Sequence, residues 1–149
     1  MKSRALITGA SSGIGFAYAK HLSKEGWILD LISESEERSI KSKEALDYLN
    51  ANFYLADLSK KSSIKEIISN HETPDLIVAN AGIAINGSIG KLGASQKEDA
   101  YYLMCGGVID LIEGFVQKMI KKGVGRIVII SSIGAITAMP KSSIYASAK

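Results

Sequence analysis

The chain of 149 residues carries a formal net charge of +3, and 46% of its residues are hydrophobic and 22% charged. This is the composition of an ordinary globular domain, and the length allows one hydrophobic core. No apolar run is long enough to cross a bilayer, no signal peptide is recognisable, and no dense basic and aromatic cluster indicates nucleic-acid binding. We therefore expect a cytoplasmic protein with no membrane or nucleic-acid partner.

Residues that form disulfides or bind metals are few. The single cysteine, Cys105, has no partner for an internal disulfide, and the two histidines, His21 and His71, are far apart in the sequence. We therefore expect no metal centre.

Apolar runs and amphipathic segments alternate along the chain. The pattern predicts, in chain order, a strand at 5–7, a helix at 14–25, a strand at 27–32, a helix at 36–49, a strand at 52–55, a helix at 62–68, a strand at 75–79, a helix in one or two pieces over 96–121 and a strand at 126–130. A glycine-rich loop at 82–93 follows the fourth strand.

Strict alternation of strands and helices indicates parallel strands joined by helical crossovers. We therefore expect an α/β fold, a doubly wound Rossmann-type sheet, with residues 1–149 forming a single domain. Continuous apolar runs such as Ile127–Ile130 are typical of strands buried on both faces, although a sheet that stops at its fifth strand would expose an apolar edge. Ligands of such a sheet bind beyond the carboxyl ends of its strands.

A glycine-rich loop with the sequence Thr-Gly-Ala-Ser-Ser-Gly-Ile-Gly covers residues 8–15. Gly9 permits a tight turn, Gly13 lets the backbone approach a pyrophosphate, and Gly15 lets helix and strand pack closely. The following helix offers free N–H groups and the positive end of its dipole. The first two glycines are more widely spaced than in the common dinucleotide fingerprint, so the loop alone is equally consistent with a structural turn.

The end of the second strand distinguishes NAD from NADP. A carboxylate there accepts hydrogen bonds from the ribose hydroxyls, whereas an arginine pairs with a 2′-phosphate. Glu34 stands at this point, and Ser12 in the loop is not basic, so we expect NAD. Arg38 and Lys41 keep NADP as the alternative.

Tyr145 and Lys149 are four residues apart, which places both on one face of a helix. An ammonium group near the phenol favours the phenolate, so Tyr145 can exchange a proton with a substrate oxygen near neutral pH. Ser132 follows the fifth strand, and its hydroxyl can hydrogen-bond the reacting oxygen. The alternative is that Ser132 is a polar strand-end residue and that Tyr145 and Lys149 are ordinary surface residues.

Taken together, these motifs resemble those of the short-chain dehydrogenase/reductase family over the whole chain. The glycine octet matches the loop of the family verbatim, and the 13 positions from Ser132 to Tyr145 equal the spacing found in the family. The resemblance implies hydride transfer between a nicotinamide cofactor and a small alcohol or carbonyl substrate, and a homo-oligomer for a full-length member. It implies a catalytic set of Ser132, Tyr145 and Lys149. It implies cofactor contacts from Gly9, Ser11, Ser12, Gly13, Ile14, Gly15, Glu34, Asp57, Leu58, Asn80, Ala81, Gly82, Tyr145 and Lys149, with Asp57 and Leu58 near the adenine and Asn80–Gly82 near the adenosine ribose.

Two departures from the family pattern limit what the resemblance implies. Met104 falls where the family usually carries an asparagine that holds a proton-relaying water, and methionine cannot anchor such a relay. The chain is also shorter than the usual members of about 250 residues, so the parts that select the substrate are expected outside it or in the loop near residues 83–95. Three hypotheses follow: the N-terminal part of an NAD-dependent oxidoreductase, a dinucleotide-binding module without turnover, and a truncated product.

Overall fold

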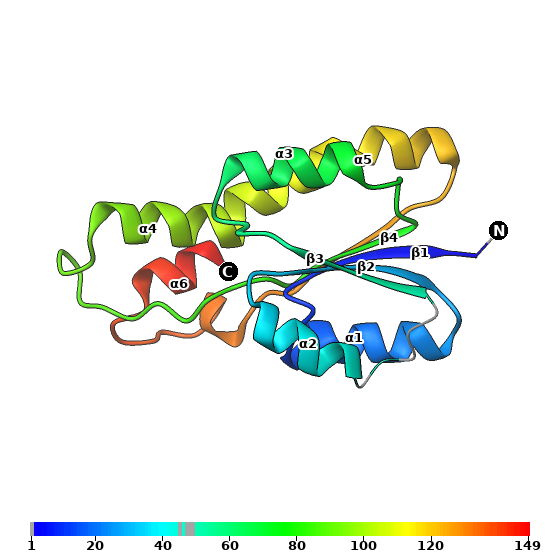
Figure 1. Ribbon diagram of the computed structural model, residues 1–149. Helices are drawn as coiled ribbons and strands as arrows, with labels where there is room; N and C mark the ends of the chain where they lie inside the picture. Colours follow the sequence, from blue (N-terminus) through cyan, green and yellow to red (C-terminus); the bar gives the residue numbers. More distant parts are fainter. Residues whose placement is uncertain (1, 45, 47–49) are drawn as a thin grey trace.

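Strands and helices alternate along the chain in the computed structural model, which describes residues 2–44, 46 and 50–149 (Figure 1). The strands are β1 (Arg4–Thr8), β2 (Ile28–Ser33), β3 (Ala51–Leu55), β4 (Leu76–Ala79) and β5 (Arg126–Ile129). The α-helices are α1 (Gly13–Lys24), α2 (Glu36–Glu44), α3 (Lys61–Asn70), α4 (Ala94–Tyr101), α5 (Gly107–Lys122) and α6 (Ser143–Ala148). A π-helical segment, η2 (Tyr102–Gly106), joins α4 to α5, and a 3₁₀ turn, η3 (Ile133–Ala135), follows β5.

The strands form one parallel sheet in the order β3-β2-β1-β4-β5. The order reverses between β1 and β4, so α1 and α2 cover one face of the sheet while α3 and α5 cover the other (Figure 1). This confirms the predicted doubly wound Rossmann-type sheet. The reversal leaves a crevice at the carboxyl ends of β1 and β4, which is where ligands of such sheets bind.

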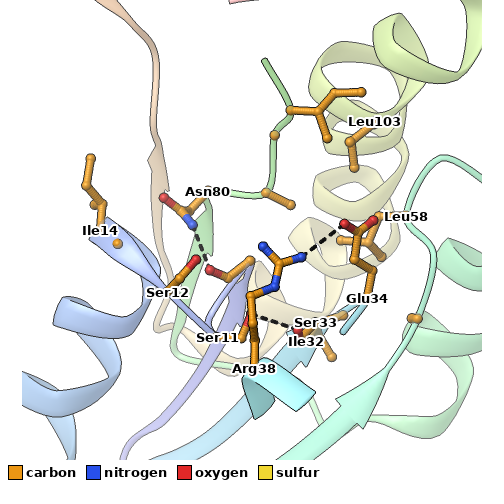
Figure 2. Close-up of a pocket in the computed structure, with 16 residues that line it drawn as sticks. Ser11, Ser12, Ile14, Ile32, Ser33, Glu34, Arg38, Leu58, Asn80 and Leu103 are labelled. Carbon is orange, nitrogen blue, oxygen red and sulfur yellow. Dashed lines mark hydrogen bonds and ion pairs between the residues drawn. The ribbon is translucent and has the colours of Figure 1, made fainter. Parts of the chain in front are cut away.

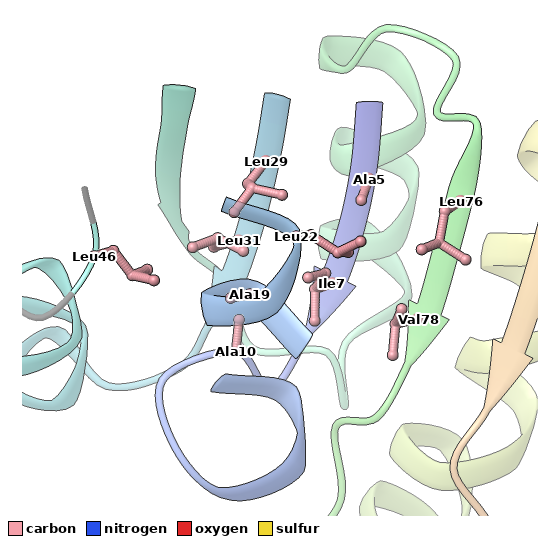
Figure 3. Packing of buried hydrophobic residues seen from close by; sticks show 10 residues of the cluster. All are labelled: Ala5, Ile7, Ala10, Ala19, Leu22, Leu29, Leu31, Leu46, Leu76 and Val78. Carbon is pink, nitrogen blue, oxygen red and sulfur yellow. The ribbon is translucent and has the colours of Figure 1, made fainter. Parts of the chain in front are cut away.

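Strand β4 and the middle of β1 are apolar on both sides because helices cover both faces of the sheet. Between the sheet and α1, alternate strand residues pack against the helix (Figure 3), and this cluster includes Ala5, Ile7, Ala19, Leu22, Leu29 and Leu31. The intervening residues Leu6 and Ile77 point to the other face, where they pack with Leu111 and Phe115 of α5. The period of two along each strand therefore divides the core into two layers.

The helices differ from the predicted ranges mainly at their ends. The predicted helix at 36–49 is observed as α2, Glu36–Glu44, and residues 45 and 47–49 lie outside the described residues. The predicted helix at 96–121 is a continuous helical stretch whose geometry changes at η2, beside Gly106 and Gly107, which have weak helix propensity. Among the described helices, none has the length and apolar character needed to span a membrane.

Strand β5 is not buried as its apolar sequence suggests. Ile127 is 40% exposed and Ile129 is 57% exposed. The expectation of burial on both faces is wrong for this strand because β5 pairs only with β4 and lies at the edge of the sheet in the described structure. The expected exposed apolar edge is confirmed.

Replacement of Phe115, the largest fully buried side chain, tests this layer arrangement. We expect Phe115→Ala to lower the free energy of unfolding by about 3–5 kcal/mol, because it removes buried apolar contacts and leaves a cavity. Ile109→Ala on the same helix is the control, since Ile109 is 52% exposed and should change stability by no more than about 0.5 kcal/mol. Urea unfolding measures both variants, and equal losses would contradict the assignment of the core.

Candidate active site

A pocket of about 390 Å³ lies at the carboxyl ends of β1, β2 and β4 (Figure 2). Its volume is within the range of small-molecule and cofactor sites. Its lining comes from the glycine-rich loop at residues 8–15, from the segments at the ends of β2, β3 and β4, and from one residue each of α2 and η2. The lining residues are Gly9, Ser11, Ser12, Gly13, Ile14, Ile32, Ser33, Glu34, Arg38, Ala56, Leu58, Asn80, Ala81, Gly82, Ile83 and Leu103.

The floor of the pocket is held by hydrogen bonds between the ends of β1 and β4. The backbone N–H groups of Asn80 and Ala81 both donate to the Thr8 hydroxyl at 3.0 Å. The Asn80 side-chain amide donates to the carbonyl oxygens of Thr8 at 3.0 Å and Gly9 at 3.1 Å. The glycine-rich loop and the segment after β4 therefore form one connected unit.

The three glycines of the loop have different structural roles. Gly9 and Gly13 have φ angles of +64° and +55°, in the left-handed region that favours glycine. A Cβ at Gly15 would lie 2.5 Å from both the Asn80 amide nitrogen and the Gly9 carbonyl oxygen, so only glycine fits there. A Cβ at Gly13 would meet nothing within 4 Å. The loop therefore leaves free space at Gly13, which lines the pocket, and is tightly packed at Gly15, beneath the pocket.

Helix α1 begins at Gly13 with no side-chain cap from Ser12 and no acidic residue in its first turn. The N–H groups of that turn are therefore free to bind a ligand at the pocket, and the positive end of the helix dipole favours an anionic one. The exposed side chain of Ile14 forms an apolar part of the same rim.

Polar contacts fix the β2 side of the pocket. The Ser33 hydroxyl donates to the Ser11 hydroxyl at 2.8 Å, and the Ser42 hydroxyl of α2 donates to the Ser11 carbonyl at 2.8 Å. At the mouth, the Arg38 guanidinium pairs with the Glu34 carboxylate at 3.3 Å, and both side chains are about half exposed (Figure 2). Water screens such a pair, so a ligand can displace it at small cost.

Of Asp57 and Leu58, the two residues after β3 that were predicted to lie near the adenine, only Leu58 lines the pocket. The Asp57 carboxylate instead accepts the backbone N–H of Ser59 at 2.9 Å. Hydrogen bonding from Ser59 holds the pKa of Asp57 below its ordinary value, so the group is ionised at neutral pH. Asp57 thus shapes the turn that presents Ala56 and Leu58 to the pocket.

Ser132 and Tyr145 approach each other around the buried Gly134. A Cβ at Gly134 would lie 3.3 Å from the Tyr145 ring and 3.4 Å from the Ser132 hydroxyl oxygen. The Gly134 N–H donates to that oxygen at 3.1 Å, which leaves the hydroxyl hydrogen of Ser132 available to another acceptor.

Lys149 connects this pair to the pocket. Its ammonium group donates to the Ile130 carbonyl at 2.9 Å, and its own carbonyl accepts the Ser131 hydroxyl at 2.7 Å. A Cβ at Gly82 would lie 3.2 Å from the Lys149 nitrogen, and Gly82 lines the pocket. Of the predicted catalytic residues, Lys149 therefore lies next to the Gly82 end of the pocket, Ser132 and Tyr145 lie around Gly134, and none of the three lines the pocket.

Met104 lies in η2 and is 5% exposed. It packs in a small apolar cluster with Ala148 and Tyr145 of α6, and a Cβ at Gly82 would lie 3.6 Å from its Cγ atom. Met104 therefore lies beside the Lys149 end of the site. The surface it presents there is apolar.

The structure brings most of the predicted cofactor residues together around the pocket, and four of them do not line it. Gly15 packs beneath the pocket, Asp57 turns away from it, and Tyr145 and Lys149 lie outside its lining. Sequence reasoning did not single out Ile32, Ser33, Ala56, Ile83 or Leu103 as lining residues. Ser33 and Ala56 could have been predicted as lining residues, because they stand at the end of β2 and just after the end of β3. Leu103 had no signal, because it comes from a helix remote in sequence.

Comparison with known proteins is consistent with this geometry. Residues 3–149 match the family model described as short chain dehydrogenase. The chain is 31% identical to a 3-oxoacyl-(acyl-carrier-protein) reductase of Buchnera aphidicola, covering 97% of this chain and 61% of that protein. It is 33% identical to the enzyme of the same name from Rickettsia prowazekii, covering 97% and 59%. The chain thus spans about three fifths of the length of these relatives.

Solved structures show the same fold. The alcohol dehydrogenase of Comamonas testosteroni, described as specific for bulky-bulky ketones, superposes with a TM-score of 0.90 at 25% identity, covering 99% of this chain and 61% of that one. A short-chain dehydrogenase of Sphingobium yanoikuyae in complex with NADPH superposes with a TM-score of 0.89 at 25% identity, covering 99% and 60%.

The contact between Gly15 and Asn80 can be tested by a double-mutant cycle. Gly15→Ala should destabilise the fold by about 1–3 kcal/mol, because the methyl group would displace the Asn80 amide. Asn80→Ala should then cost less in that background than in the unchanged chain, with a coupling of about 0.5–3 kcal/mol in urea unfolding. Gly26→Ala is the control, because a Cβ at Gly26 meets nothing within 4 Å and its effect should add to that of Asn80→Ala. Additivity in both pairs would contradict the contact.

Proposed function

Because the chain belongs to the short-chain dehydrogenase family, we propose that it is the catalytic and NAD(P)-binding part of an oxidoreductase that acts on an alcohol or carbonyl substrate. The observation that carries the proposal is a single juxtaposition. A pocket opens at the free N-terminus of α1, and its Gly82 end adjoins the Lys149 ammonium, with Tyr145 and Ser132 beyond. We propose that residues 1–149 form one dinucleotide-binding domain.

The residues of the pocket fit a dinucleotide. The first turn of α1 would hold the diphosphate, since the backbone is open at Gly13 and its N–H groups are free of side-chain caps. Glu34 at the mouth would accept hydrogen bonds from the adenosine ribose, and the apolar surface of Leu58 would lie against the adenine. When bound, the nicotinamide cofactor supplies or accepts the hydride.

The side chains around Gly134 would move the accompanying proton. In the reducing direction, Tyr145 gives its phenolic proton to the substrate oxygen, and in oxidation it takes the proton back. Ser132, whose oxygen already accepts the Gly134 N–H, donates its hydroxyl hydrogen to the same substrate oxygen. Lys149 uses one of its three donors on Ile130, and the other two can serve the nicotinamide ribose and Tyr145.

A second candidate function is dinucleotide binding without turnover. Met104 favours it, because its buried thioether stands beside the Lys149 end of the site and offers no anchor for a proton-relaying water. The two functions share the pocket and differ only in proton transfer.

Turnover separates the two functions. We expect the protein to reduce carbonyl substrates with NADH. The assay uses two forms, the chain as it stands and a form extended at its C-terminus. Tyr145→Phe should lower kcat by about 10²–10⁴-fold while NADH affinity is retained, because only the proton donor is lost. Tyr101→Phe, at a tyrosine that is 48% exposed on α4, should leave kcat unchanged. NADH binding without turnover in both forms would reject the enzyme and support the binding module.

Cofactor choice is tested at the mouth of the pocket. We propose a preference for NAD, because the Glu34 carboxylate would repel a 2′-phosphate and occupies Arg38 in an ion pair. Glu34→Gln should therefore raise NADPH affinity relative to NADH by about tenfold, measured by fluorescence titration. Glu66→Gln is the control, since Glu66 is exposed on α3, on the other face of the sheet, and does not line the pocket. Tighter binding of NADPH than NADH by the unchanged chain would contradict the preference.

A further inference from the structure

The segment that leads into α6 is tied to the loop after β4 by two hydrogen bonds. The Ser142 hydroxyl donates to the Asn86 side-chain oxygen at 2.8 Å, and the Gly87 N–H donates to the Lys141 carbonyl at 2.7 Å. Both bonds join parts of the chain that are far apart in sequence. Neither is needed to form a strand or a helix, so their effect is to fix the loop and the start of α6 relative to each other.

Ser142 is unusual for a serine in front of a helix. A serine in this position commonly caps the helix by accepting a hydrogen bond from an N–H of the first turn. Here the side chain makes no such cap bond, and only the Ser142 carbonyl takes part in the helix, accepting the Ala146 N–H at 2.8 Å. The hydroxyl is used on Asn86 instead, and the residue is 3% exposed.

The backbone next to Ser142 also has an uncommon conformation. Among the residues that the structure describes, Lys141 is the one non-glycine residue with a positive φ, +62°. This left-handed region is unfavourable for a residue with a Cβ. In this conformation the Lys141 carbonyl accepts the Gly87 N–H, so the second hydrogen bond accompanies the strained backbone. Strain of this kind tends to occur at functional sites.

Apolar packing continues the contact toward Tyr145. Ile85 of the loop packs in the same small cluster as Ile144, Tyr145 and Ala148 of α6. Tyr145 also follows Ser142 by three residues, within one helical turn. A shift of Ser142 would therefore be passed directly to the phenol.

We propose that Asn86 and Ser142 are positioning residues, which hold α6 so that the Tyr145 hydroxyl stays in register with Ser132 and Lys149. The proposal rests on the proposed function for its catalytic consequence.

The hydrogen bond has a direction, and that direction sets the experiment. Asn86→Asp keeps an oxygen acceptor in the same place, whereas Asn86→Leu has a similar size and no acceptor. Ser142→Ala removes the donor. We expect Asn86→Leu and Ser142→Ala to lower kcat about tenfold, with little change in KM or in NADH affinity, and Asn86→Asp to retain kcat. Ser143→Ala, at an exposed serine one residue further, should match the unchanged chain.

The pH–rate profile of kcat separates positioning from general loss of stability. It should change in Asn86→Leu and Ser142→Ala, where Tyr145 is no longer held beside Lys149, and should not change in Ser143→Ala. Unchanged kcat in folded Asn86→Leu and Ser142→Ala, or an equal loss in Asn86→Asp, would overturn the proposal.

Failure of the proposed function is distinguished by hydrogen exchange. If the unchanged chain reduces no carbonyl substrate, the proposed oxidoreductase activity fails. The positioning of α6 by the Ser142–Asn86 hydrogen bond is then tested by the exchange rates of the backbone amides of Ala146, within α6, and Lys149, just after it. If these amides exchange about fivefold faster in Asn86→Leu and Ser142→Ala and at an unchanged rate in Asn86→Asp, the hydrogen bond positions α6 as proposed. Equal exchange in all variants overturns the proposal.

Discussion

The site depends on the hydrogen bonds that join the ends of β1 and β4. At this point neighbouring strands lead to opposite faces of the sheet, so the carbonyl groups of Thr8 and Gly9 lie beyond the residues that pair β1 with β4. Asn80 supplies the donors for both, and the Thr8 hydroxyl accepts two N–H groups in return. Buried polar groups are costly when unpaired, so this exchange fixes the loop in one conformation. The absence of a side chain at Gly15 is what makes room for the Asn80 amide.

Much of this arrangement could be predicted because it rests on short-range patterns. Alternating apolar runs give parallel strands, and the octet at residues 8–15 places a glycine where the backbone turns at Gly9 and where it must be close-packed at Gly15. The burial of β5 could not be predicted in the same way. Its sequence is apolar, which shows only that these side chains favour burial. Whether they are buried depends on which other elements cover the strand.

Side-chain contacts between distant segments were also beyond the reach of the sequence. A serine before α6 predicts a helix cap, yet Ser142 bonds to Asn86, a residue 56 positions earlier. Likewise Asp57 stands at the expected acidic position, but its carboxylate accepts the Ser59 N–H and does not line the pocket. Leu103 lines the pocket from the π-helical segment η2. Each of these outcomes depends on the three-dimensional approach of two segments, which no local pattern encodes.

The Lys149 end of the site shows how an apolar neighbour directs a polar group. The ammonium group has three donors, and Ile130 accepts one of them. Met104 lies beside this end of α6 and its thioether is at best a weak acceptor, so it offers little to the remaining donors. Gly82 separates the ammonium group from the pocket without a side chain of its own. A ligand hydroxyl placed at Gly82, or the Tyr145 oxygen, is then the acceptor that Lys149 lacks. The methionine thus provides no acceptor for the two remaining donors of the lysine, which are available to a bound ligand or to Tyr145.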